Sequence, residues 1–104
     1  METIIIKLDS KKMENPDLDI RYLLPEMIEE CTDEKIVDNG YDYITGDELG
    51  LWLETENAEE MVGFVVELIK TKKVLDNDLT KSAEIYISSQ ECAEICNSKK
   101  VFPV

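Results

Sequence analysis

The sequence predicts an α+β protein with a ferredoxin-like sandwich, in which two helices cover one face of an antiparallel sheet. The main observation is the order of the apolar patterns along the chain, which reads strand, helix, strand, strand, helix, strand. The second is size: 104 residues suit a single domain, residues 1–104, and 43% of them are hydrophobic, enough for an ordinary core.

The first strand and the first helix are indicated by composition and spacing. Residues 3–8 (TIIIKL) are β-branched and apolar, as in a strand. Asn15 and Pro16 suit the N-cap and the first position of a helix. An apolar stripe then runs through residues 20–31 at helical spacing. Pro25 interrupts this stripe, so we expect a kink or the start of a second short helix there.

The middle of the chain predicts two further strands. Residues 35–37 and 41–45 are expected to be extended, with Asn39–Gly40 as a turn or bulge between them. A second turn at Gly46–Asp47 precedes the alternating residues 49–55, which predict the next strand.

The second half begins with a helix signal, because Asn57 followed by Glu60 fits a capping box. The helix after it ends among lysines, up to Lys73, which favour the negative end of a helix dipole. Residues 83–88 predict the last main strand, and the tail from Glu91 is expected to be a short strand or an irregular edge.

The net charge of −13 is concentrated in one part of the chain. Residues 26–60 hold thirteen acids and a single base, Lys35, whereas the remaining residues are almost neutral. Crowded carboxylates destabilise a folded protein by repulsion. This charge opposes binding to nucleic acids and to anionic membranes. It favours a basic protein partner, with cation binding or plain solubility as the alternatives.

Strand alternation predicts which side chains occupy the sheet face without helices. Trp52 and Glu54 are expected there, because the leucines of the same strand belong under the helices. Glu84 and Tyr86 follow by the same argument, and Tyr41 and Tyr43 join them if the bulge keeps them on that side. With the nearby acids, the predicted partner-binding residues are Tyr41, Tyr43, Trp52, Glu54, Glu56, Glu59, Glu60, Glu84 and Tyr86. The competing interpretation is that Trp52 packs under the C-terminal tail or in a homodimer contact.

The sequence offers little for catalysis or for metal binding. It contains no histidine, which removes the usual general base and a common metal ligand. Cys31, Cys92 and Cys96 are an odd number for a disulfide framework, so we expect reduced thiols, no structural metal and a cytoplasmic protein. The start of the chain lacks the pattern of a secretory signal, and no apolar run is long enough to span a membrane. We therefore expect neither an enzyme nor a cofactor.

Three segments carry a resemblance to a known family: PDLDIRYLLPEMIEE, DNGYDYI and KVLDNDL. They resemble elements of small acidic bacterial immunity proteins of polymorphic-toxin or contact-dependent inhibition systems, over a span from Asn15 to Tyr86. The resemblance implies a cytoplasmic protein that neutralises a basic toxin, such as a nuclease, by occupying its active-site surface. The alternative is a dimeric ferredoxin-like regulatory or small-ligand-binding protein that associates through its open sheet face.

Overall fold

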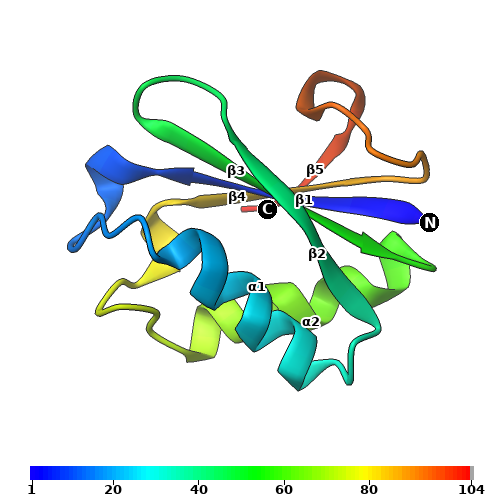
Figure 1. Cartoon of the computed structure of the whole chain (residues 1–104), viewed down its shortest axis with the longest axis horizontal. Coiled ribbons are helices and arrows are strands. Elements are labelled where there is room, and N and C mark those ends of the chain that lie inside the picture. The colour runs from blue at the N-terminus through cyan, green and yellow to red at the C-terminus, as the bar shows by residue number, and fades with distance from the viewer. Residues whose placement is uncertain (104) are drawn as a thin grey trace.

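The sheet and its two helices have the predicted architecture in the computed structural model, which describes residues 1–103 (Figure 1). Within these residues, one antiparallel sheet has the strand order β2-β3-β1-β4-β5. The strands are β1 (Glu2–Asp9), β2 (Ile36–Tyr43), β3 (Glu48–Thr55), β4 (Ala83–Ser88) and β5 (Lys99–Phe102). The helices α1 (Ile20–Cys31) and α2 (Ala58–Thr71) follow β1 and β3 and lie on the same face of the sheet (Figure 1). The α+β, ferredoxin-like prediction is confirmed, with β5 added beside β4 at one edge.

The core lies between the helices and the sheet because apolar residues alternate in the strands and recur every three or four positions in the helices. Each fully buried aliphatic side chain contributes about 1.5–3 kcal/mol before the entropy of ordering the chain is subtracted. The completely buried contributors include Ile4, Ile6, Leu51, Leu53 and Ile85 from the strands and Leu24, Ile28 and Val65 from the helices.

The helix α1 begins four residues later than Pro16, so the predicted N-cap at Asn15 is wrong. The Asn15 backbone N–H donates instead to Asn77 Oδ1 at 2.7 Å, and Asn77 Nδ2 donates to the Asn15 carbonyl at 2.8 Å. These tertiary hydrogen bonds hold the residues before α1 in a non-helical conformation. The helix then continues through Pro25 up to Cys31.

The helix α2 begins as predicted at its cap. The side chain of Asn57 accepts a hydrogen bond from the Glu60 backbone N–H at 3.1 Å. The carboxylate of Glu2 accepts from the Ala58 backbone N–H at 2.8 Å, so a second free donor of the first turn is satisfied from β1. The helix ends at Thr71, before the lysines at 72 and 73.

The connection between β4 and β5, residues 89–98, lies on the side of the sheet opposite the helices (Figure 1). It is attached there by Thr3 of β1, whose hydroxyl donates to the Gln90 carbonyl at 2.7 Å and accepts from the Ala93 N–H at 3.4 Å. Part of the sheet face that the sequence leaves open is therefore covered by the chain itself.

Candidate functional site

The sheet face away from the helices, here called the second face, carries the predicted residues but is not open. Trp52 and Tyr86 flank Ile5 across the three central strands, and Ile5 is completely buried. The indole N–H of Trp52 donates to the Ala93 carbonyl at 2.8 Å, and its ring lies over Gly50. The expectation that Trp52 is an exposed anchor is therefore wrong. It is half-buried under residues 89–98, as the competing interpretation of its role stated.

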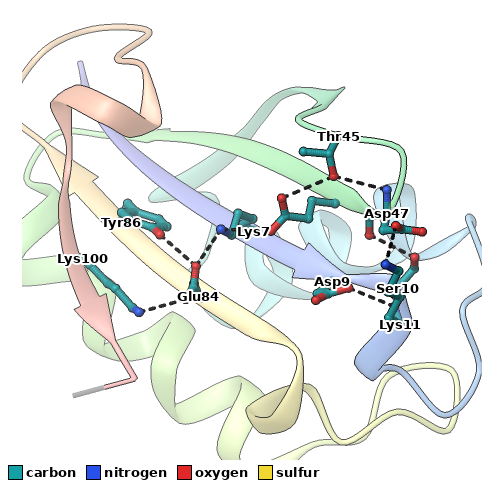
Figure 2. A network of polar contacts seen from close by, with 10 residues as sticks. Lys7, Asp9, Ser10, Lys11, Thr45, Asp47, Glu84, Tyr86 and Lys100 are labelled. Atoms are coloured by element: carbon teal, nitrogen blue, oxygen red, sulfur yellow. Dashed lines mark hydrogen bonds and ion pairs between the residues drawn. The ribbon is translucent and has the colours of Figure 1, made fainter.

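Glu84 and Tyr86 belong to a network of polar contacts on the second face (Figure 2). Lys7 Nζ lies 2.9 Å from Glu84 Oε1 and 3.1 Å from Glu48 Oε2. Lys100 Nζ lies 2.8 Å from Glu84 Oε2, and the Tyr86 hydroxyl donates to Glu84 Oε1 at 2.9 Å. The two lysines lower the pKa of Glu84 from its ordinary value of 4.5 to about 2. The Glu84 carboxylate is thus neutralised within the chain.

Replacing Glu84 with glutamine is expected to lower the free energy of unfolding by about 2 kcal/mol at pH 7, because Lys7 and Lys100 lose their shared carboxylate. The loss is not larger because the three side chains are partly exposed and water weakens their ion pairs. A carboxylate whose pKa is lower in the folded state stabilises the protein above its unfolded pKa, here 4.5. That contribution declines as the pH falls from 4.5 towards 2. Urea unfolding should be measured at pH 7 and at pH 2. The difference in stability between wild type and variant should be large at pH 7 and small at pH 2. Equal differences at the two pH values would contradict this prediction, and Glu67→Gln, at an exposed position of α2, is the control.

The other predicted acids lie at the end of β3 and the start of α2. Glu54 is half-buried on the second face, where it pairs across the sheet with Thr3. Glu59 and Glu60 are exposed in the first turn of α2, where negative charge stabilises the helix dipole. Glu56 and Glu60 line one surface hollow together with Glu34, which follows α1. The fold therefore brings part of this group next to the acids of α1.

Tyr41 and Tyr43 lie on the helix side of the sheet and not with Trp52, so their predicted place on the second face is wrong. Their partners across the ladder are Leu51 and Leu49, which face the helices. The physical reason is the β-bulge at Asn39–Gly40, where Gly40 has φ +99°. One extra residue in β2 reverses the alternation, and every later side chain of the strand changes face.

The reversal brings Tyr41 and Tyr43 against α1, where they form a cluster called here the tyrosine patch: Arg21, Tyr22, Tyr41 and Tyr43. The rings of Tyr22 and Tyr41 meet edge to face with centroids 6.1 Å apart, and those of Tyr41 and Tyr43 at 6.3 Å. The Arg21 guanidinium carbon lies 4.6 Å from the Tyr22 ring centroid and 5.2 Å from that of Tyr41. These contacts hold the three rings in fixed positions relative to one another.

The three rings of the tyrosine patch are exposed to solvent. Tyr22, Tyr41 and Tyr43 are 54%, 42% and 50% exposed, respectively. Within residues 1–103, seven large hydrophobic side chains are exposed, and these three tyrosines are among them. The Arg21 guanidinium lowers the pKa of the Tyr22 phenol, whereas the neighbouring Tyr22 side chain raises the pKa of Tyr41. Aromatic rings held rigidly in solvent are typical anchors of protein interfaces.

The sequence reasoning missed Arg21 and Tyr22. A signal for Tyr22 was present, because it falls outside the buried stripe of Ile20, Leu24 and Ile28 and must therefore point away from the core. Nothing in the order of residues indicated that it would meet Tyr41, since that contact depends on the bulge.

An acidic hollow lies beside the tyrosine patch at the end of α1. The Glu29 carboxylate accepts the Asp38 backbone N–H at 3.0 Å, so α1 and β2 are joined here as they are by Tyr22 and Tyr41. The negative end of the α1 helix dipole adds further negative potential there. The hollow has a volume of about 440 Å³ and is lined by Glu26, Glu29, Glu30, Asp33 and Glu34.

Other kinds of site find little support within residues 1–103. No group of three or more acids and cysteines is arranged to hold a metal ion there. Cys31, Cys92 and Cys96 are exposed and unpaired. No helix in this part of the chain is both long and apolar enough to cross a membrane.

Comparison with protein-family models, with curated proteins and with solved structures gives no match to this chain. The functional proposal therefore depends on the geometry and charge of the residues described above.

Proposed function

We propose that this protein is a non-enzymatic binding module that captures a basic protein partner through the tyrosine patch, in the manner of an immunity protein that neutralises a toxin. The observation that carries the proposal is the pre-ordered, exposed cluster of Tyr22, Tyr41 and Tyr43 beside an acidic hollow. Aromatic side chains supply short-range affinity at a modest entropic cost, and the surrounding charge selects the partner.

The charge supports a partner with a basic surface. Five carboxylates line the acidic hollow without a lysine or arginine among them. Such a group destabilises the free protein through repulsion, and a basic partner relieves that repulsion on binding. A toxin that acts on nucleic acid would present a basic groove of this kind, and this protein would then compete with the nucleic acid for it.

The dimeric alternative depended on an open second face. Residues 89–98 cover part of that face, and another part contains the ion pairs of Lys7 and Lys100 with Glu84. A homodimer through the tyrosine patch would bring two acidic hollows together in a chain with a net charge of −13. Both features favour a foreign partner of opposite charge.

The kinetic test replaces three acids of the hollow, Glu26, Glu29 and Glu30, with glutamine. The association rate with the purified partner is expected to fall about tenfold at low salt and to depend less on ionic strength, because these charges steer the encounter. Stopped-flow fluorescence over a range of salt concentrations measures both quantities. The matched control changes three exposed acids outside residues 26–60, Glu67, Asp76 and Glu91, and removes the same charge. Equal effects of the two triple variants would reject steering by the hollow.

A further inference from the structure

A small cavity opens next to the tyrosine patch and shares Tyr43 with it. It lies between the residues that precede α1 and the turn joining β2 to β3, and its volume is about 60 Å³. Buried Leu8, Ile20 and Leu49 line it together with exposed Leu18 and Gly46. The cavity therefore has an apolar interior and an edge that solvent reaches.

The size and lining of this cavity restrict what it can hold. A dry apolar cavity of roughly 150 Å³ accepts a benzene ring, so a space of about 60 Å³ is too small for an aromatic ring and suits the end of a branched aliphatic side chain. Burying such a group is favourable because apolar surface is removed from water. Tyr43 belongs to both the cavity and the tyrosine patch, which makes the two surfaces continuous.

We propose that this cavity receives one aliphatic side chain, such as leucine, from a basic segment of the protein partner. The inference rests on the proposed function and adds the chemistry of the segment that is recognised. Three acids line the cavity, and two of them, Glu48 and Asp47, already pair with Lys7 and Lys11. The Asp17 carboxylate accepts only the Asp19 backbone N–H among the described contacts, so it is the charge at the cavity that selects a basic segment. A second copy of this acidic chain would lack the required charge.

The experiment titrates the protein with capped tripeptides and follows backbone amide signals by ¹H–¹⁵N NMR. A peptide with leucine between two arginines is expected to shift the signals of Leu18, Tyr43, Gly46 and Leu49. A matched peptide with glycine in place of leucine should bind about tenfold more weakly, because it buries no aliphatic group. A peptide with leucine between two glutamates should cause no comparable shifts at this cavity, because its charge is repelled.

Variants at two similarly exposed positions test whether the leucine peptide binds at this cavity. Leu18 is 52% exposed at the cavity and Phe64 is 53% exposed on α2. Leu18→Ser should remove the preference for the leucine peptide over the glycine peptide, and Phe64→Ser should retain it. Equal binding of the leucine and glycine peptides to the wild type, or an unchanged preference in Leu18→Ser, would overturn the inference.

Measurements of partner binding by two variants distinguish failure of this inference from failure of the proposed function. Tyr22 belongs to the tyrosine patch and does not line the cavity, whereas Leu18 lines the cavity and lies outside the patch. If Tyr22→Ala weakens partner binding and Leu18→Ser does not, the proposed function stands and the cavity inference fails. If the leucine peptide occupies the cavity but Tyr22→Ala leaves partner binding unchanged, the cavity inference stands and the proposed role of the tyrosine patch fails.

Discussion

Replacing Trp52 with alanine is expected to lower the free energy of unfolding by about 3 kcal/mol. Trp52 packs over Gly50 on the second face and donates to the Ala93 carbonyl, so the variant loses the packed ring and one of the hydrogen bonds that attach residues 89–98. The space above Gly50 is filled, because a Cβ there would clash with the Trp52 ring. Urea unfolding followed by circular dichroism measures the change.

Trp52→Phe is the matched variant, because it keeps an aromatic ring but loses the indole N–H and part of the indole volume. It should cost about 2 kcal/mol, less than Trp52→Ala, because one hydrogen bond and part of the packing are lost. Both Trp52 variants should bind the partner with nearly wild-type affinity under conditions where they are folded. If Trp52→Ala instead left stability unchanged and abolished binding, Trp52 would be the exposed anchor that the sequence predicted.

Replacing Tyr41 with alanine is expected to weaken partner binding by about 2 kcal/mol or more, roughly thirtyfold in Kd. Tyr41 is the central ring of the tyrosine patch, in contact with Tyr22, with Tyr43 and with the Arg21 guanidinium. Its removal deletes one anchor and releases the two neighbouring rings. Isothermal titration calorimetry with the purified partner measures the loss.

The stability of Tyr41→Ala should change by less than about 1 kcal/mol, because Tyr41 is 42% exposed and lies on an edge strand, outside the core. Phe64→Ala removes an exposed ring from α2 and serves as the control. Wild-type affinity in Tyr41→Ala, or an equal loss in both variants, would show that the tyrosine patch is not the binding surface.

The elements of the fold were readable from the sequence because each depends on a local pattern. Alternating leucines define β3, and the cap at Asn57 marks the start of α2 in both the sequence and the structure. The start of α1 was misplaced because hydrogen bonds between Asn15 and Asn77, 62 residues apart, outweighed a local capping signal. Tertiary contacts of this kind produce no periodic pattern of residues, so they cannot be recognised in a sequence.

The candidate site was predicted only in part, and two physical causes explain the rest. The Asn39–Gly40 signal was recognised, but a turn and a bulge place Tyr41 on opposite faces of the sheet. Residues 89–98 have no apolar period, so nothing in the sequence showed that they would cover Trp52. As a result, the aromatic residues assigned to one surface divide between a covered second face and an exposed patch against α1.

The most direct measurement is capture from a lysate of the source cell, with wild-type protein and a Tyr22→Ala, Tyr41→Ala double variant immobilised side by side. The wild type is expected to retain a basic protein in stoichiometric amount at low salt and to release it at high salt. The double variant should retain little or none of the same protein. Equal retention by both columns, or recovery of no basic protein by the wild type, would contradict the proposal that the tyrosine patch binds a basic partner.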